Sequence, residues 1–127
     1  MKIKYLFIIT GVVFFISGLI GLFLPPSQLA IYGIEVSSGA LYMTQWEGLA
    51  SLVIGILAFL FRNVNDLIAQ KVMSFSMIIY LLGGLIISIM GTLNKQNNEL
   101  GWVAAAFCLL LMIGYISFLF GKNKKAK

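Results

Sequence analysis

Four long apolar stretches fill most of this 127-residue chain and decide the solvent in which it folds. They run over Tyr5–Leu24, Ala40–Phe61, Val72–Leu93 and Leu100–Phe120. A hydrocarbon core about 30 Å thick is crossed by about 20 apolar residues in a helix, and each stretch supplies that length. Because backbone polar groups in lipid must pair within their own segment, each stretch is expected to be helical. The sequence therefore predicts an all-α membrane protein with four spans.

Composition and spacing indicate one domain rather than several. Hydrophobic residues make up 61% of the chain and charged residues 10%, whereas soluble domains carry about 45–50% and about 25%. Helices near 5–24, 40–61, 67–93 and 100–120 leave short connections, so residues 1–127 form a single transmembrane domain. Short connections make successive helices antiparallel neighbours, which predicts an up-down-up-down four-helix bundle. The first apolar run exceeds the 7–15 residues typical of a signal peptide, so we expect it to be retained.

The basic residues are distributed unevenly, and this predicts the orientation. One of the nine, Lys95, lies between the third and fourth stretches. The others lie at the termini or beside the second connection: Lys2, Lys4, Arg62, Lys71, Lys122, Lys124, Lys125 and Lys127. Since Lys and Arg accumulate on the cytoplasmic side of membrane proteins, we expect both termini in the cytoplasm. The net charge of +5 is thus interpreted as a topology signal of a multi-pass membrane protein.

Residue types needed for metal binding and catalysis are scarce. The chain has no histidine and a single cysteine, Cys108. Four-ligand zinc, His-ligated haem and iron–sulfur sites are thereby excluded within one chain. The sequence also lacks a glycine-rich phosphate loop and a carboxylate pair suited to acid–base chemistry. We therefore expect a protein that is not an enzyme and uses no metal or cofactor.

The second stretch holds one unusual polar cluster, formed by Thr44, Gln45, Glu47 and Ser51. Glu47 lies seven residues inside the stretch, or about 10 Å at 1.5 Å per residue. Ionisable groups within a span are costly and usually mark a functional site. We expect these four residues to bind a ligand or a proton. The alternative is a structural hydrogen bond to a neighbouring helix, or a carboxylate that reaches water at the outer surface.

Small residues recur at helical spacing and predict where helices touch. Lipid provides no hydrophobic force between helices, so close backbone approach at small residues drives their packing. We expect helix packing at Gly18, Gly21, Gly48, Gly55, Gly84, Ser88 and Gly114. The pattern leaves open whether these contacts form within one chain or between chains. Tyr80 and Tyr115 fall mid-span and need a hydroxyl partner if buried, either on a neighbouring helix or in a pocket.

The longest connection is the outer segment 25–39, which opens with Pro25 and Pro26. The first helix is expected to end there, because proline lacks an N–H and disfavours helix in the residue before it. The segment contains many apolar residues, which favours a short helix or hairpin that caps the bundle at the interface. A partner-binding surface is the functional alternative.

The outline resembles small bacterial four-helix membrane proteins of the DoxX-like kind. The residues that carry this resemblance are Leu24-Pro25-Pro26, Tyr32-Gly33 and Gln45-Trp46-Glu47-Gly48 with Gly55, in a helix ending at Arg62. The resemblance implies a four-helix bundle in the bacterial cytoplasmic (inner) membrane. It assigns no site residue, because such families often carry an intramembrane arginine that has no counterpart here.

Together these features predict a non-enzymatic integral membrane protein that acts through helix packing. It would serve as an accessory subunit or as a lipid- or small-molecule-binding bundle. Its partners would be the lipid bilayer and a second copy of the chain or another membrane protein, with no nucleic acid. The alternative function is a small oligomeric proton-coupled transporter that uses Glu47.

Overall fold

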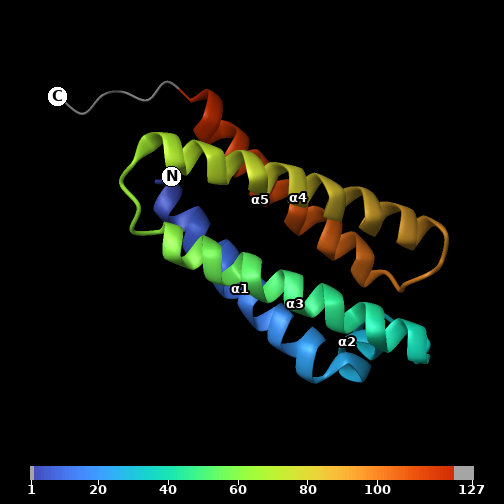
Figure 1. The fold of residues 1–127 in the computed structure, drawn as a ribbon. Coiled ribbons are helices and arrows are strands. Elements are labelled where there is room, and N and C mark those ends of the chain that lie inside the picture. Colours follow the sequence, from blue (N-terminus) through green and yellow to red (C-terminus); the bar gives the residue numbers. More distant parts are fainter. Residues whose placement is uncertain (1, 122–127) are drawn as a thin grey trace.

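The structure is a computed structural model that describes residues 2–121. Its five helices are α1 (Ile3–Phe23), α2 (Pro25–Ile31), α3 (Ser38–Phe61), α4 (Leu67–Leu93) and α5 (Leu100–Phe120), arranged as shown in Figure 1. All but α2 are long and apolar enough to cross a membrane. The predicted all-α fold with four candidate spans is therefore confirmed. The limits of α4 and α5 agree with the predicted helices, whereas α1 and α3 each begin two residues earlier and α1 ends one residue earlier.

The outer segment contains the short helix α2, one of the two forms expected for it. α1 ends at Phe23, and Pro25 occupies the first position of α2, where a missing N–H leaves no bond unmade. The chain then turns at Gly33, whose φ of 66° is a conformation that favours glycine. This turn directs the chain from α2 into α3.

Side chains at the starts of α3 and α4 cap their unpaired backbone N–H groups. The Ser37 hydroxyl accepts a hydrogen bond of 3.1 Å from the N–H of Ala40. The carboxylate of Asp66 accepts one of 2.6 Å from the N–H of Ala69. Such caps satisfy groups that the helix itself leaves without a partner. The Ser37 cap explains why α3 begins at Ser38 rather than at the predicted residue 40.

The long helices pack as two pairs, α1 with α3 and α4 with α5 (Figure 1). In the first pair, Gly11 lies against Phe59 and Gly21 lies against Gly48, so α1 and α3 run antiparallel. The two backbones approach without a side chain between them, as expected for small residues in lipid. α3 and α4 follow one another in sequence but touch little. The two pairs are therefore distinct units within the bundle.

A cluster of buried side chains joins the pairs at the end where the N-terminus lies (Figure 1). The Phe7 ring packs against the rings of Phe61 and Tyr115, with centroids 6.0 and 5.8 Å apart. The hydroxyls of Thr10 and Tyr115 are both buried, lie 2.8 Å apart and share a hydrogen bond. Tyr115 thus bonds a neighbouring helix, which is one of the two roles expected for it. We call Phe7, Thr10, Phe61 and Tyr115 the aromatic cluster.

Hydrogen bonds from Asn98 join the pairs at the opposite end. The backbone N–H of Asn98, in the connection between α4 and α5, donates to the carbonyl of Tyr32 at 2.8 Å. Its side-chain amide donates to the carbonyl of Ile31, also at 2.8 Å. The pairs are therefore joined at both ends, through Asn98 and through the aromatic cluster.

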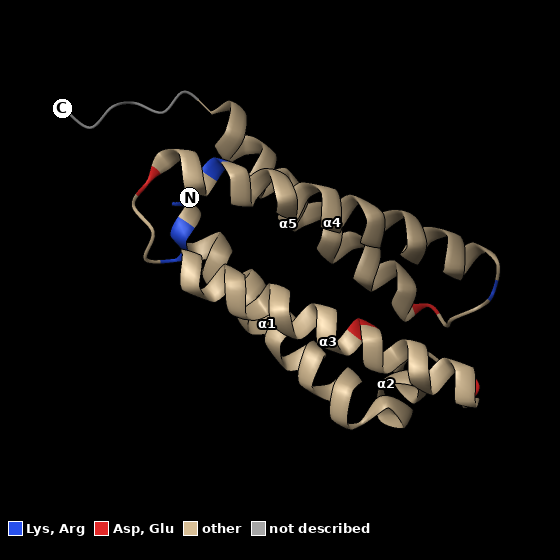
Figure 2. Cartoon of the chain, viewed as in Figure 1, with Lys and Arg blue, Asp and Glu red and all other residues tan. Residues whose placement is uncertain are grey.

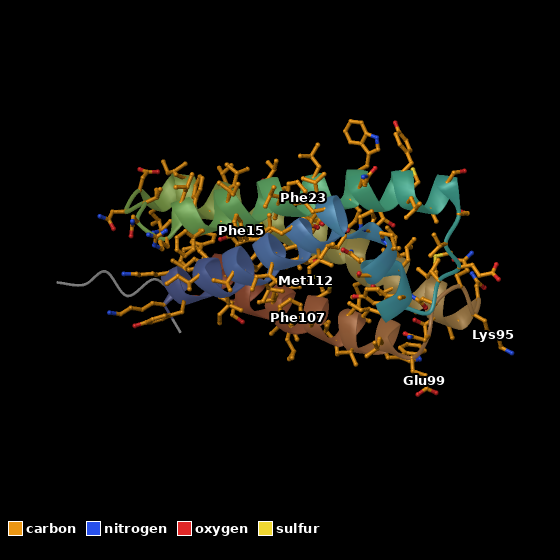
Figure 3. The ribbon with its side chains drawn as sticks, turned by 90° about the horizontal axis from the view of Figure 1, so that it is seen from below. Phe15, Phe23, Lys95, Glu99, Phe107 and Met112 are labelled. Atoms are coloured by element: carbon orange, nitrogen blue, oxygen red, sulfur yellow. The ribbon has the colours of Figure 1, made fainter. Side chains whose placement is uncertain are left out.

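The described charged residues other than Glu47, which lies within α3, gather at the two ends of the molecule. Figure 2 shows the basic residues concentrated at the end that carries the N-terminus. The described basic residues near the N-terminus and beside the α3–α4 connection are Lys2, Lys4, Arg62 and Lys71. Lys95 and Glu99 lie at the other end and point away from the helices (Figure 3). The lysines of residues 122–127 lie outside the described residues. The described charges thus keep the asymmetry from which the orientation was predicted.

Candidate functional site

Glu47 is the only acidic residue within the four long helices of the described chain, and it is held by two neutral donors. The Ser51 hydroxyl, one turn later on α3, donates to its Oε1 at 2.6 Å. The Gln28 side-chain amide, on α2, donates to its Oε2 at 2.9 Å. Hydrogen bonds to a carboxylate are stronger than those between neutral groups. The two bonds therefore fix the carboxylate between α2 and α3, while the Glu47 side chain remains exposed.

Gln28 reaches Glu47 because α2 folds back over a glycine of α1. A Cβ at Gly21 would lie 2.7 Å from Gln28 Oε1, so any side chain there would displace the amide. The Nε2 of Gln28 faces the carboxylate, since an amide turned the other way would set two acceptors against each other. Its Oε1 is buried and makes no hydrogen bond to the described residues. The orientation imposed by Glu47 thus leaves one buried acceptor on Gln28.

Two tyrosines lie around this carboxylate. Tyr80 on α4 places its hydroxyl 3.4 Å from the Ser51 hydroxyl, which extends the polar network to the second pair of helices. Tyr32, in the turn after α2, is half-buried, and burial raises the pKa of its phenol, with a smaller contribution from the charge of Glu47. Tyr32 therefore stays neutral near pH 7 and keeps its hydroxyl proton.

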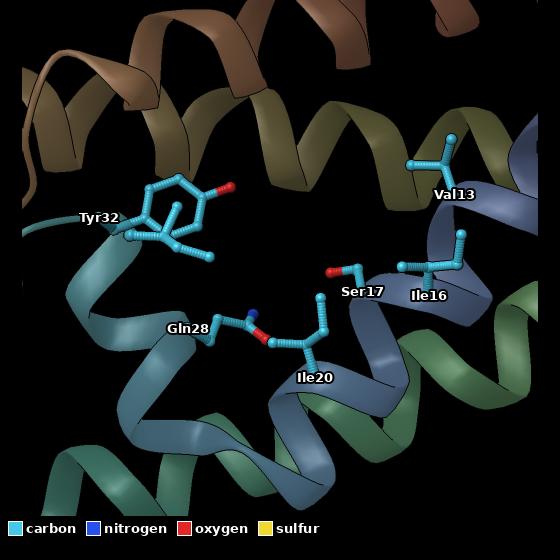
Figure 4. A pocket seen from close by; sticks show the side chains of 7 residues that line it. Val13, Ile16, Ser17, Ile20, Gln28 and Tyr32 are labelled. Carbon is cyan, nitrogen blue, oxygen red and sulfur yellow. The ribbon is translucent and has the colours of Figure 1, made fainter.

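An apolar pocket of about 300 Å³ lies beside this network (Figure 4). Residues of α1, α2 and the following turn line it: Val13, Ile16, Ser17, Ile20, Gln28, Ile31 and Tyr32. The side chains of Ile16 and Ile31 are 53% and 49% exposed, so the pocket opens on the lateral surface of the helix bundle. Gln28 both lines the pocket and donates to Glu47, and the two therefore form one site.

The four predicted binding residues do not all meet. Glu47 and Ser51 are bonded to each other, as described. The Thr44 hydroxyl donates to the backbone carbonyl of Ala40 at 2.8 Å and so serves its own helix. Gln45 lines a second crevice of about 240 Å³ on another side of α3, together with Trp46. Two positions apart on a helix are separated by about 200°, which explains why Gln45 and Glu47 face different surroundings.

The predicted packing residues serve contacts within the chain in most cases. The α1–α3 contact contains four of them: Gly18, Gly21, Gly48 and Gly55. A Cβ at Gly84 would lie 3.3 Å from the thiol of Cys108, which places Gly84 in the α4–α5 contact. Gly114 packs under Leu6 and so links α5 to α1. Ser88 is partly buried on α4.

Sequence reasoning did not select Gln28 or Tyr32 for the site. Both lie in the outer segment, where the expectation was a cap over the bundle. The one available signal was Gln28 itself, an amide among apolar residues. Its contact with Glu47 depends on the direction in which α2 folds back, which local sequence patterns do not specify.

The site contains no cluster suited to a metal ion among the described residues, in which no three His, Cys, Asp or Glu side chains come together. Comparison with protein-family models, curated proteins and solved structures found no match to the chain. The geometry around Glu47 is therefore the basis on which a function can be proposed.

Proposed function

We propose that this chain is a non-enzymatic, multi-pass integral membrane protein that binds a lipid chain or small apolar molecule in the pocket beside Glu47. One observation carries the proposal: Gln28 lines the apolar pocket and donates to the intramembrane carboxylate. Ligand pockets typically combine apolar walls with a few fixed polar groups. A carboxylate inside a span also marks a functional site by default, because its placement there is costly.

The proposed orientation has four spans in up-down-up-down order with both termini in the cytoplasm of a bacterium, in its cytoplasmic membrane. The basic residues at the N-terminal end support it through the positive-inside rule. Glu47 and α2 then belong to the outer half of the bundle. Because the exposed wall residues Ile16 and Ile31 would face acyl chains, a ligand would enter sideways from the bilayer rather than from water.

The role of the glycines follows from their contacts. Gly18 and Gly48 meet the opposing backbone inside the chain, so they support the fold of the α1–α3 pair rather than a partner interface. An unused small position remains on α4, where a Cβ at Gly83 would meet nothing within 4 Å. A second copy of the chain or another membrane protein would have to use such a surface.

A proton-coupled transporter is the second candidate, favoured by the neutral character of both partners of Glu47. Protonation would turn one carboxylate oxygen into a donor and break its bond to Gln28 or Ser51. In such a transporter, Glu47→Gln abolishes proton-driven uptake by vesicles. In a binding protein, the pocket continues to bind an uncharged ligand after the same substitution.

The proposal is tested by photo-crosslinking in vesicles made from the lipids of the host membrane. The probe is an uncharged dodecyl alcohol with a diazirine in its chain, and labelled residues are identified by mass spectrometry. We expect more label at Ile16 than at Ile87, a 73% exposed residue of α4. Ser17→Phe fills the pocket and should remove this excess.

Ser76→Phe is the matched control, because Ser76 is exposed on α4 and lies outside the pocket. It should leave labelling at Ile16 unchanged. Equal labelling of Ile16 and Ile87 in the unmodified protein, or labelling at Ile16 that survives Ser17→Phe, would contradict the proposal.

A further inference from the structure

The charge of Glu47 is not balanced by its partners. Gln28 and Ser51 are neutral, and each supplies one hydrogen bond to a different carboxylate oxygen. A carboxylate has about four acceptor positions, so about half of them are still available. The described Lys and Arg residues other than Lys95 gather at the end that carries the N-terminus (Figure 2), and Lys95 points away from the helices at the other end (Figure 3). The site therefore combines a carboxylate with spare acceptor capacity. Glu47 does not itself line the pocket, but its side chain is exposed and is bonded to Gln28, which does.

The Tyr32 ring also favours a cation at the polar end of the pocket. Tyr32 contributes an aromatic ring to the pocket wall, and the negative face of such a ring attracts ammonium groups. An anionic head group would meet the Glu47 carboxylate, and a like-charge contact of that kind opposes binding.

The size and opening of the pocket limit the rest of the ligand. Its volume of about 300 Å³ is at the lower end of ligand pockets, which span about 300–1,000 Å³. One apolar chain or a small ring system fits such a space, whereas the two chains of a phospholipid do not fit in it together. The wall formed by Val13, Ile16 and Ile20 runs along α1, and so a chain bound there would lie beside that helix (Figure 4).

We infer that the site takes a single-chain amphiphile with a cationic ammonium head group, entering from the surrounding bilayer. Its chain packs against Val13, Ile16 and Ile20, and its head lies between the Glu47 carboxylate and the Tyr32 ring. This inference rests on the proposed function, because it names the ligand class of the same pocket. It adds that Glu47 selects the ligand by charge.

The test compares probes that share one diazirine-bearing dodecyl chain and differ in the head group: trimethylammonium, hydroxyl or sulfate. A fourth probe is a two-chain phospholipid with the trimethylammonium-bearing choline head. Label at Ile16 is divided by label at Ile87, which cancels differences in how much of each probe enters the bilayer. We expect this ratio to be at least tenfold higher for the ammonium probe than for the sulfate probe, and near one for the phospholipid.

Two variants and a control assign the preference to the site. Glu47→Gln should lower the ratio of the ammonium probe about tenfold and leave that of the hydroxyl probe unchanged. Tyr32→Leu removes the ring but keeps the carboxylate, and it should lower the same ratio by a smaller factor. Glu99→Gln, the same chemical change in the connection before α5, should alter neither. Unchanged labelling by the hydroxyl probe shows that each variant still forms the pocket.

The outcomes separate this inference from the proposed function. If the hydroxyl probe labels Ile16 selectively but the ammonium probe has no advantage, or keeps its advantage in Glu47→Gln, the inference is overturned and the binding function stands. Selective labelling by the two-chain phospholipid would overturn the single-chain assignment. If no probe labels Ile16 above Ile87, the inference and the binding function both fail.

Discussion

Replacing Gly48 by alanine should destabilise the bundle, because this glycine sits where the backbones of α1 and α3 meet. A Cβ at Gly48 would lie 2.9 Å from the Cα of Gly21 and would also contact the backbone N of Leu22. The carbonyl carbon of Gly21 would lie nearer still, at 2.5 Å. Carbon atoms normally pack about 3.5–4.0 Å apart, so the helices would have to separate by roughly 1.0–1.5 Å. Backbone atoms cannot rotate away as a side chain can, and the clash therefore has to be relieved by moving a helix.

The magnitude follows from two opposing effects. Overpacking a tight contact costs about 1–3 kcal/mol, and a backbone contact belongs at the upper end of that range. Alanine is favoured over glycine in a helix by about 1 kcal/mol. We therefore expect Gly48→Ala to lower the free energy of unfolding by about 1–2 kcal/mol. Gly83→Ala is the matched control, since its new Cβ meets nothing within 4 Å and keeps only the helix-propensity gain.

Both variants can be measured by reversible unfolding in mixed micelles, with circular dichroism reporting helix content against the fraction of denaturing detergent. The free energies of unfolding of the two variants should differ by about 2–3 kcal/mol, with Gly83→Ala the more stable. Equal stability would refute the reasoning, because it would show that Gly48 is not in close contact with α1.

Two further predictions concern the aromatic cluster and the orientation. Thr10→Val and Tyr115→Phe should each lower the free energy of unfolding by about 1 kcal/mol, because each change leaves a buried hydroxyl without its partner. The double variant should lose less than the sum of the two single losses. Additive losses would contradict the hydrogen bond. For the orientation, Asn63→Cys and Lys95→Cys are made separately in a Cys108→Ala background and treated with a membrane-impermeant maleimide. Asn63→Cys should react from the cytoplasmic side and Lys95→Cys from the opposite side. Labelling of both variants from the same side would overturn the proposed topology.

Much of the fold follows from features that the sequence displays locally. The apolar run from residue 100 to 120 and the proline at residue 25 each set helix ends within a residue or two of those observed. The small residues Gly18 and Gly48 also pointed to close helix packing. Local patterns do not say which helices pack against each other, however, because any two helix faces lined with small residues can pack together. The division into two pairs with little contact between α3 and α4 arises from tertiary packing that no single helix encodes.

The candidate site was predictable on one helix and not across two. Glu47 and Ser51 are four residues apart, a spacing that brings side chains together on any helix. Gln45 was grouped with them by proximity in sequence, although helical geometry places it on another face. Gln28 entered the site through the reversal of the chain between α1 and α2, which depends on the conformation of Leu24 and on the space left by Gly21. Contacts of this kind become visible only when the helices are placed in space.

Native mass spectrometry of the protein, released gently from its own membrane, tests the binding function most directly. We expect the protein to retain one small single-chain molecule per copy, and Ser17→Phe to lose it while Ser76→Phe keeps it. Equal retention by Ser17→Phe and the unmodified protein would contradict binding in this pocket. A protein partner at fixed stoichiometry, with no small molecule retained, would contradict it as well and would assign the chain to an accessory role.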